Sequence, residues 1–433
     1  MILHAEQRAT DRATLEAGAD PLDVLAGWPA RTPLVAIVSG PGARRTVLAT
    51  PAGTSISMPG EALARVGAAS GDATRGWIGV IDYEAGRAIE PRAGDRSERC
   101  PGMPVARWQR VESAMVHDRV TGVWTRVGDG VVPFDGVRRP ARVGELVAVD
   151  GRDKYEANVA RAIEYIHAGD VYQANVAHRM AAPFEGSARA LFVELMRASG
   201  AWFGAYLEWD DERGRHAVLS ASPELFLTLD GATGRVVTRP MKGTARADSG
   251  SRLDTEKDRA ELNMIVDLMR NDLGRVCQFG SVRVEQAQAV ERHASGDIAL
   301  HQGVATIAGL LRRGLGLEDL LRATFPGGSV TGAPKIRAMQ IIDELEGFDR
   351  GAFCGSIGHV TDDGNATFNI AIRTATISGE AGGAGADDFA GATLTYPVGA
   401  GIVADSAPAA EWGETMAKTG VLRAAIERLR SGV

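Results

Sequence analysis

Cysteine is scarce in this sequence, which contains only Cys100, Cys277 and Cys354 and has no Cys-x-x-Cys pair. A disulfide framework or a zinc cluster needs more cysteines at closer spacing, so we expect neither. Long apolar runs are missing too: no stretch of about 18 apolar residues occurs, and the charged beginning of the chain does not resemble a signal peptide. We therefore expect a cytoplasmic protein that does not associate with membranes.

Positive charge is also in short supply. The 433 residues include 48 Lys and Arg against 55 Asp and Glu, which gives a formal net charge of −7. A general nucleic-acid binder carries the opposite balance, so we expect no nucleic-acid partner. The hydrophobic fraction of 45% is ordinary for a globular protein. A small charged substrate is compatible with these totals, because a local basic pocket is not visible in a sum.

The chain divides into two regions at about residue 143. Residues 1–143 mix short apolar runs with Gly and Asp-Gly turns, a pattern that indicates strands. Residues 144–433 carry helical and strand patterns in separate blocks, which favours an α+β fold over a parallel β-α-β sheet. The predicted helices cover 152–168, 254–272, 317–323, 333–345 and 408–430, and the main predicted strands cover 171–178, 216–230, 234–240, 354–361, 366–377 and 392–403.

Two short segments join predicted strands. Residues 231–234 should form the turn of a hairpin, because two strand patterns flank glycines there. Residues 380–391 are rich in Gly, Ala and Asp, and this composition predicts a flexible hairpin loop.

Two predicted helices carry acidic residues on the face that should be buried. In the earlier one, Leu262, Ile265 and Met269 form a single stripe at about 100° per residue, and Asp258 and Glu261 fall on it. An unpaired buried carboxylate costs several kcal/mol or becomes protonated. The alternative is that these acids lie near a helix N-terminus and are stabilised by its dipole, which suits Asp258 better than Glu261.

The last predicted helix repeats the pattern, since Glu411, Glu414 and Lys418 fall on its apolar side. A divalent cation would compensate acids from both helices at once. Mg²⁺ usually takes one or two protein carboxylates and completes its shell with water and ligand oxygens. We therefore expect Mg²⁺ with Glu261 and Glu414 as direct ligands and with Asp258 and Glu411 behind them.

Three further features suit an anionic ligand, and each has a structural alternative. Gly399, Ala400 and Gly401 form a Gly-x-Gly that either lets backbone N–H groups approach a carboxylate or makes a tight turn. Arg373 lies within a predicted strand, where it either pairs with an acid or binds a substrate carboxylate. The segment FPGGSVTGAPK is a structural turn or an anion site at a helix N-terminus. Together they suggest a small substrate with several carboxylates.

Six motifs in order give the sequence a family resemblance. They are SASPELFL, RPMKGTARA, KDRAELNMIVDLMRNDLGR, FPGGSVTGAPKIRAM, FNIAIRTA and GAGIVADSAPAAEWGETMAK. The sequence resembles the chorismate-utilising enzymes: anthranilate synthase component I, aminodeoxychorismate synthase component I, and isochorismate and salicylate synthases. The resemblance covers about 145–433 and, more loosely, 75–90. It implies a large antiparallel β-sandwich with surrounding helices, to which residues 1–143 add strands, and a chorismate-binding catalytic domain over 144–433.

The resemblance also implies roles for particular residues. Chorismate is the expected substrate, Glu261 and Glu414 the expected Mg²⁺ ligands, and Glu224 a catalytic acid/base beside the ring. Thr244 is expected to line the same pocket. The groups that resemble the family's carboxylate-binding set are Arg373, Lys418 and the backbone of Gly399, Ala400 and Gly401.

Lys242 points to one subgroup of this family. The segment PMKGT resembles the PIKGT of aminodeoxychorismate synthases more than the PIAGT of anthranilate synthases. The resemblance implies that Lys242 adds to C2 of chorismate and displaces the C4 hydroxyl, after which ammonia enters at C4 and the product is 4-amino-4-deoxychorismate. Gln173 stands where salicylate and isochorismate synthases have a lysine that activates water, so water is not the expected nucleophile.

The expected source of ammonia is a separate glutamine amidotransferase, because no Gly-x-Cys-x-Gly elbow occurs in this sequence. The alternative within the family is anthranilate synthase component I, which converts chorismate to anthranilate and pyruvate. A non-catalytic relative that binds chorismate or a partner is the alternative of a different class. The segment HQGVATIAG departs from the family's His-Leu-Val-Ser, with Gln302 in the aligned place and His301 one residue early, so no catalytic histidine is predicted.

Overall fold

The computed structural model describes residues 18–40, 44–53, 55–56, 75–94, 106–129, 136–246, 256–295, 298–382 and 387–431. Only the backbone is described for residues 55–56, 244–246, 256–258, 293–295 and 298–300. Among the helices in these ranges, none is long and apolar enough to cross a membrane.

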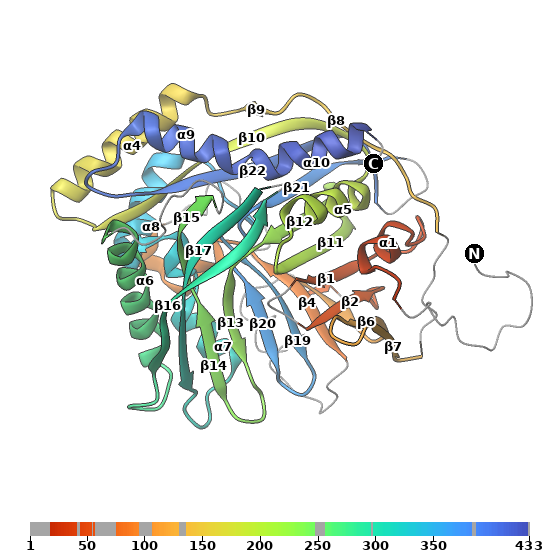
Figure 1. The fold of residues 1–433 in the computed structure, drawn as a ribbon, viewed down its shortest axis with the longest axis horizontal. Coiled ribbons are helices and arrows are strands. Elements are labelled where there is room, and N and C mark those ends of the chain that lie inside the picture. Colours follow the sequence, from red (N-terminus) through yellow and green to blue (C-terminus); the bar gives the residue numbers. More distant parts are fainter. Residues whose placement is uncertain are drawn as a thin grey trace, which may run out of the picture.

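Two antiparallel sheets form the centre of the molecule (Figure 1). The 12-stranded sheet contains, in spatial order, β18 (Gly332–Ala333), β10 (Gln173–Ser187), β22 (Asp388–Ile402), β21 (Thr374–Ala381), β12 (Gly214–Ser222), β11 (Phe203–Asp211), β1 (Val35–Ser39), β2 (Arg45–Ala49), β6 (Ala114–Asp118) and β7 (Val123–Val127). Two short strands, β8 (Ala141–Val143) and β9 (Val147–Ala148), pair with β10.

The 10-stranded sheet packs against the 12-stranded sheet, and side chains of both sheets share one buried cluster. In spatial order it contains β15 (Met241–Arg246), β17 (Ile298–Leu310), β14 (Arg235–Arg239), β13 (Leu225–Leu229), β20 (Ala366–Asn369), β19 (Ser356–Thr361), β4 (Gly76–Ile81), β5 (Ala106–Val111) and β3 (Ser55–Ile56). A further strand, β16 (Arg283–Ser295), pairs with β17 at the edge. Strands from the N-terminal region therefore take part in both sheets.

Helices surround the two sheets. They are α1 (Pro21–Ala26), α3 (Ala85–Ile89), α4 (Arg152–His167), α5 (Ala188–Ser199), α6 (Glu256–Gly274), α7 (Leu317–Thr324), α8 (Lys335–Glu346), α9 (Pro408–Lys418) and α10 (Gly420–Ser431), with short 3₁₀ turns η1 (Pro91–Ala93) and η2 (Gly328–Val330). Helices α5 and α10 cover the 12-stranded sheet, α9 lies over β22, and α6 packs against β17 and β15 (Figure 1). The predicted α+β sandwich with surrounding helices is confirmed.

The space between the sheets is filled by small and β-branched side chains. Val35, Ala205 and Leu207 of the 12-stranded sheet belong to one buried cluster with Ile78 and Val80 of the 10-stranded sheet. Alternation along each strand explains this arrangement, because every second side chain points to the same face. The opposite face of the larger sheet is covered by helices, so its strands are apolar on both sides.

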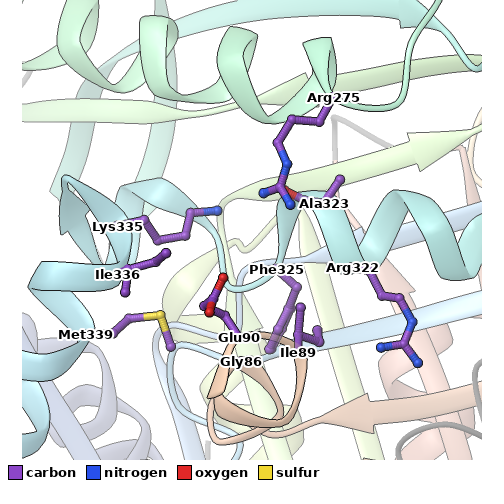
Figure 2. Close-up of a pocket in the computed structure, with 10 residues that line it drawn as sticks. All are labelled: Gly86, Ile89, Glu90, Arg275, Arg322, Ala323, Phe325, Lys335, Ile336 and Met339. Atoms are coloured by element: carbon purple, nitrogen blue, oxygen red, sulfur yellow. The ribbon is translucent and has the colours of Figure 1, made fainter. Parts of the chain in front are cut away.

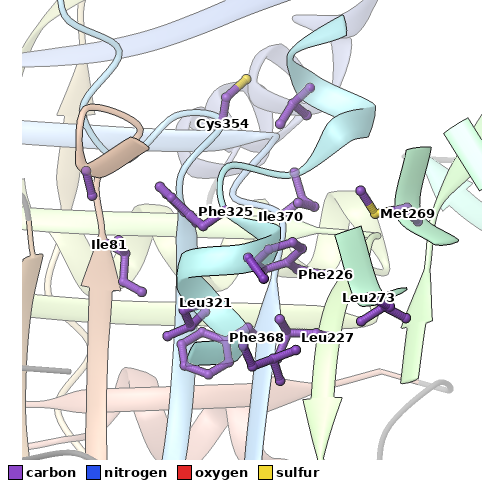
Figure 3. Packing of buried hydrophobic residues seen from close by; sticks show 14 of the residues in the cluster. Ile81, Phe226, Leu227, Met269, Leu273, Leu321, Phe325, Cys354, Phe368 and Ile370 are labelled. Carbon is purple, nitrogen blue, oxygen red and sulfur yellow. The ribbon is translucent and has the colours of Figure 1, made fainter. Parts of the chain in front are cut away.

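The helix α6 shows the link between sequence and packing most directly. Its residues Leu262, Ile265, Met269 and Leu273 recur at three- and four-residue spacing and are all buried. Figure 3 shows Met269 and Leu273 directed toward Phe226 of β13. Burial of each such side chain stabilises the fold by about 1.5–3 kcal/mol. The apolar stripe predicted for this helix is therefore confirmed.

Three predicted strands differ from the observed ones. The strand expected over 171–178 continues to Ser187, because β10 pairs with β22 along nearly its whole length. The strand expected over 216–230 is interrupted at Pro223, which has no N–H for the ladder. The strand expected over 366–377 is interrupted before Thr374, where Arg373 adopts a left-handed φ of 51°.

The remaining differences concern the C-terminal region. The single helix expected over 408–430 is two helices, with a break at Thr419 just before Gly420. Glycine weakens a helix because its backbone loses more freedom on folding than that of other residues. The centre of the loop predicted over 380–391, residues 383–386, lies outside the described residues. The hairpin predicted across residues 231–234 is confirmed by the pairing of β13 with β14.

Candidate active site

Glu224 lies in the interruption between β12 and β13, and its side chain is buried. Ser329 of η2 donates a hydrogen bond from Oγ to Oε1 of Glu224, over 2.6 Å. Burial raises the pKa of Glu224 to about 7, against the opposing effects of the Ser329 hydrogen bond and the positive charge of Lys242. A carboxyl with a pKa near neutrality is half protonated there, which suits it to act as a general acid or base.

Lys242 lies on β15 at an irregularity in the pairing with β17. The next residue, Gly243, has a φ of 74°, a conformation that residues with a side chain rarely adopt, and it makes this irregularity possible. The Nζ atom of Lys242 lies 3.8 Å from Oε2 of Glu261. Burial lowers the pKa of Lys242, an effect that Glu261 opposes and Lys418 reinforces. A lysine with a lowered pKa is more often the neutral amine that can act as a nucleophile.

Three polar groups converge on the open face of Gly401. A Cβ at this position would lie 3.0 Å from Nζ of Lys242, 3.0 Å from Nε2 of Gln173 and 3.1 Å from Oδ1 of Asn175. Glycine is therefore needed at residue 401, because a side chain would displace these groups. The Gly-x-Gly lies inside the extended strand β22, so the tight turn considered from the sequence is not present.

Gln173 has unused hydrogen-bonding capacity in this place. Its side chain is fully buried, and neither its amide oxygen nor its amide nitrogen has a hydrogen-bond partner among the described residues. Buried side-chain amides are nearly always hydrogen-bonded in folded proteins. The position of this amide beside the amine of Lys242 marks a place where a ligand would complete its hydrogen bonds.

Arg373 also has a polar atom without a hydrogen-bond partner among the described residues. Burial lowers the pKa of its guanidinium, and Nη1 has no hydrogen-bond partner among the described residues. No described acidic side chain forms an ion pair with it, so the alternative that Arg373 pairs with an acid in the fold is wrong for this part of the chain. A buried charge without a partner is costly. The arrangement favours an anionic ligand that reaches this guanidinium.

The helix α9 carries one buried glutamate, Glu411, and one exposed glutamate, Glu414. Glu411 is buried and accepts a hydrogen bond from Ser406 over 2.7 Å. Glu414 and Lys418 form an ion pair of 2.8 Å in which 55% and 43% of their side chains remain exposed, so the prediction that both are buried is wrong. The buried residues of this segment are Glu411 and Thr415 of α9 and the C-cap residue Thr419, which recur at four-residue spacing.

Lys418 also contacts the glycine strand. Its Nζ donates a hydrogen bond to the carbonyl oxygen of Gly399 over 2.7 Å. The helix α9 is held against β10 and β22 by an aromatic stack, in which the rings of His178 and Trp412 lie 4.7 Å apart. These contacts of Lys418 and Trp412 hold α9 over the C-terminal part of β22, and so they position Glu414 and Lys418 there.

Charged residues from three other segments lie around the amine of Lys242. Its pKa responds to the charges of Glu261 from α6, Lys418 and Glu414 from α9, and Glu224 from the β12–β13 connection. These segments lie up to about half the chain apart in sequence, and only the sandwich brings them together. The two helices that were predicted to share a Mg²⁺ ion thus both place an acid near Lys242, and the ion itself stays a prediction.

Glu261 and Glu414, the two acids expected to bind Mg²⁺, both influence the pKa of Lys242. No group of three His, Cys, Asp or Glu side chains in the described part could hold a metal ion by itself. Mg²⁺ usually takes only one or two protein carboxylates, so two are enough when a substrate supplies the remaining oxygens. Without a metal, lysines compensate these acids, Lys242 beside Glu261 and Lys418 beside Glu414. The side chains of Asp258 and Thr244 lie outside the described residues.

The sequence analysis did not predict the buried residues that connect the segments of this site to one another. Arg350 and Glu346 form a fully buried ion pair. Arg350 donates hydrogen bonds to the carbonyl oxygens of Asn175, over 2.7 Å, and of Val330, over 3.1 Å. It thereby ties β10, which carries Gln173, to the turn that presents the hydroxyl to Glu224. No local pattern in the sequence marks such a residue, because its partners are distant in the chain.

Comparisons with known proteins agree with this architecture. A sequence profile described as chorismate binding enzyme matches residues 52–424. The chain is 43% identical over 287 residues to aminodeoxychorismate synthase component 1 of Escherichia coli K12, a match that covers 64% of this chain and 58% of the relative. It is 40% identical over 285 residues to anthranilate synthase component 1 of Aquifex aeolicus, which covers 64% of this chain and 53% of that protein. The chain thus spans less than three-fifths of the length of these curated relatives.

A solved structure with the same fold is anthranilate synthase component I from Streptococcus pneumoniae TIGR4. It superimposes with a TM-score of 0.73 at 24% identity and covers 96% of this chain and 100% of its own. At this identity the likeness concerns the fold. The sequence profile and the sequence relatives go further, and on their ground the chain belongs to the family of chorismate binding enzymes.

Proposed function

We propose that this protein is an aminodeoxychorismate synthase component 1, which converts chorismate and ammonia to 4-amino-4-deoxychorismate. The observation that carries the proposal is Lys242, whose buried amine lies beside Glu261 and within the influence of Glu224. The name of the Escherichia coli relative supports it as well. An amine nucleophile at this place is what separates this reaction from direct attack by ammonia.

The substrate carboxylates would be held by Arg373, by Lys418 and by the backbone of the Gly-x-Gly segment on β22. Arg373 supplies a buried guanidinium with no acidic partner in the described part, and Gly399, Ala400 and Gly401 supply backbone at the open end of β22. Lys418 stands at the rim beside Gly399. Mg²⁺, held by Glu261 and Glu414, would bind a further carboxylate oxygen of the substrate and neutralise its charge.

The reaction then needs one nucleophile and one acid. The lone pair of the Lys242 amine forms a bond to C2, the two ring double bonds shift, and the C4 hydroxyl leaves with the bonding pair. Glu224, with its pKa of about 7, donates the proton that turns this hydroxyl into water. Ammonia then forms the bond at C4, the double bonds shift back, and the Lys242 amine leaves C2 and is regenerated.

Ammonia is proposed to come from a separate glutamine amidotransferase. The relative is named as a component 1, which supports a second component as partner. The buried amide of Gln173 lies where it can donate or accept a hydrogen bond from an incoming neutral amine. The product would serve the route to 4-aminobenzoate and folate.

Product identification tests the proposal. The protein is incubated with chorismate, Mg²⁺ and ammonium, with and without an aminodeoxychorismate lyase. We expect 4-aminobenzoate only when the lyase is present. The Aquifex aeolicus relative favours anthranilate synthase as the second candidate, and fluorescent anthranilate with pyruvate in the absence of lyase would establish that reaction instead.

A second experiment tests the role of the lysine. Lys242→Ala should lose nearly all synthesis of 4-amino-4-deoxychorismate at low ammonium, and Lys154→Ala, an exposed lysine on α4, should retain it. Synthesis by Lys242→Ala at the wild-type rate would contradict the covalent route while leaving the product assignment intact.

A further inference from the structure

The side-chain amide of Asn175 on β10 is oriented by one contact that fixes which of its two ends faces the candidate active site. Its Nδ2 donates a hydrogen bond to the carbonyl oxygen of Ser329 over 3.1 Å. A carbonyl oxygen can only accept, so the atom that faces it is the nitrogen and the other atom, Oδ1, is an acceptor. This Oδ1 lies 3.1 Å from the position that a Cβ of residue 401 would take, and it makes no hydrogen bond with any described residue.

The backbone of Asn175 is held as closely as its amide. Its N–H donates a hydrogen bond to the carbonyl oxygen of Thr331 over 2.8 Å. Its own carbonyl oxygen accepts a hydrogen bond from Nη2 of Arg350 over 2.7 Å. In the ladder between β10 and β22 it pairs with Gly401. Because the residue is already fixed, it loses little further freedom when it binds a ligand, and so Oδ1 is a pre-organised acceptor.

The turn that carries Ser329 is anchored at both of its ends. Figure 2 shows Phe325 and Lys335, the residues at these two ends, lining the same small cavity. Lys335 donates hydrogen bonds from Nζ to Oδ2 of Asp272, over 2.6 Å, and to the carbonyl oxygen of Thr324, over 2.8 Å. Phe325 is buried. The carbonyl oxygen of Ser329 therefore has a fixed place, and it holds the amide of the residue on β10 in one orientation.

The acceptor Oδ1 of Asn175 is close to the proposed nucleophile and is linked to the proposed acid. The Nζ atom of Lys242 lies 3.0 Å from the same Cβ position on Gly401. Ser329, which binds the amide, also donates its hydroxyl to Glu224 over 2.6 Å. In the proposed reaction the lysine bonds to C2, and the glutamic acid acts on the hydroxyl at C4. Asn175 is partly exposed, so a small molecule that approaches C4 can reach Oδ1 from solvent.

The chemistry of ammonia suits such an acceptor. Ammonia has three N–H donors and a single lone pair, and this lone pair must face C4 for the bond to form. A hydrogen bond from one N–H to Oδ1 directs the lone pair away from the amide. A carboxylate at the same place would favour ammonium, because a negative charge stabilises the protonated form, which has no free lone pair. A neutral amide oxygen does not have this effect, and so it leaves ammonia nucleophilic.

We propose that Asn175 binds the ammonia of the second half of the reaction, with Oδ1 accepting one N–H and the lone pair directed at C4. The inference rests on the proposed function and names the group that positions its second substrate. Ammonia forms the C4–N bond with its lone pair, the ring double bonds shift, and the bond between C2 and the nitrogen of Lys242 breaks. The proton that ammonia gives up passes to this nitrogen, which leaves with the bonding pair as the neutral amine.

Steady-state kinetics with ammonium as the varied substrate test this role. Asn175→Leu has a side chain of similar size but no acceptor, so its KM for ammonium should rise by about tenfold or more. Its KM for chorismate should stay unchanged, because the groups proposed to hold the substrate carboxylates are intact. Asn158→Leu is the matched control. Asn158 on α4 also donates from Nδ2 to a backbone carbonyl, that of Leu345 over 2.9 Å, and its replacement should change neither constant.

A second variant and a second measurement separate positioning of ammonia from a structural role. Asn175→Asp has nearly the same shape, but its negative charge favours ammonium, so kcat should fall by about tenfold or more while the KM for ammonium does not rise. Mass spectrometry after incubation with chorismate and Mg²⁺ but no ammonium should show the adduct on Lys242 in Asn175→Leu as in the wild type. The amide acts only after this adduct has formed.

The inference is overturned if Asn175→Leu retains the wild-type KM for ammonium, or if Asn175→Asp retains the wild-type kcat. It is also overturned if Asn175→Leu unfolds at the wild-type Tm yet no longer forms the adduct on Lys242, since the amide would then act in the first half of the reaction. Failure of the proposed function looks different, because the wild type itself would then make another product or never carry the adduct.

Discussion

Replacement of Glu224 by glutamine tests the buried carboxyl at the centre of the site. Burial raises its pKa from the usual 4.5 to about 7. Between these two pH values the folded protein holds a proton that the unfolded chain has released, so the free energy of unfolding falls as the pH rises. One pKa unit corresponds to about 1.4 kcal/mol, and the shift therefore corresponds to a loss of about 3 kcal/mol across this window.

Glutamine has nearly the same shape, can accept the hydrogen bond of Ser329 and does not ionise. The loss of stability between pH 4.5 and about 7 should therefore be absent from Glu224→Gln. The measurement is the thermal unfolding of both proteins at intervals from pH 4.5 to above pH 7. We expect the difference in Tm to move by a few degrees in favour of the variant as the pH rises. A difference that stays constant over this range would refute the assignment of a buried, weakly acidic carboxyl.

Three further predictions follow from single contacts. Ser329→Ala removes a hydrogen bond that stabilises the ionised form of Glu224. Infrared titration should therefore show that the pKa of this carboxyl rises further, by about one to two units. An unchanged pKa would contradict the contact between the two side chains. Gly401→Ala places a carbon 3.0 Å from the amine of the proposed nucleophile, so kcat/KM should fall by about tenfold or more, whereas Gly413→Ala, with no atom within 4 Å of the added carbon, should leave it unchanged. Arg373→Gln removes a buried charge that has no described partner. The KM for chorismate should therefore rise, while Tm stays the same or increases. A clear fall in Tm would show that the fold needs the guanidinium.

The parts of the fold that follow from short-range patterns could be predicted from the sequence. The spacing of Leu262, Ile265 and Met269 identified the buried face of α6, because apolar periodicity is sufficient to orient a helix on a sheet. Two strand patterns that flank the glycines at residues 231–234 likewise identified the hairpin of β13 and β14. These features depend on residues that are neighbours in sequence, and so their signal is local.

The phase of α9 could not be predicted in this way. The apolar stripe of α10 was extended backwards through Gly420, and it placed Glu414 and Lys418 on the buried side. In the structure Glu411 is buried and Glu414 is not, because the buried residues of α9 recur at Glu411 and Thr415. A glycine inside an apolar pattern is compatible with a continuous helix and with a break, and only packing decides between them.

The supporting residues of the site depend on long-range contacts and carry no local signal. Ser329 contacts Glu224 across 105 positions of sequence, and Arg350 contacts Asn175 across 175. Arg373 was expected in a regular strand because its neighbours alternate, yet its left-handed backbone ends that strand. Residues of this kind become visible only when the fold brings their partners together.

The central claim is that the amine of Lys242 attacks chorismate, and mass spectrometry of the enzyme tests it most directly. The protein is mixed with chorismate and Mg²⁺ without ammonia, quenched rapidly and digested. The account predicts that the peptide carrying Lys242 gains the mass of chorismate less one water, and that this adduct disappears when ammonium is added before the quench. Formation of 4-amino-4-deoxychorismate by an enzyme that never carries this adduct would contradict it.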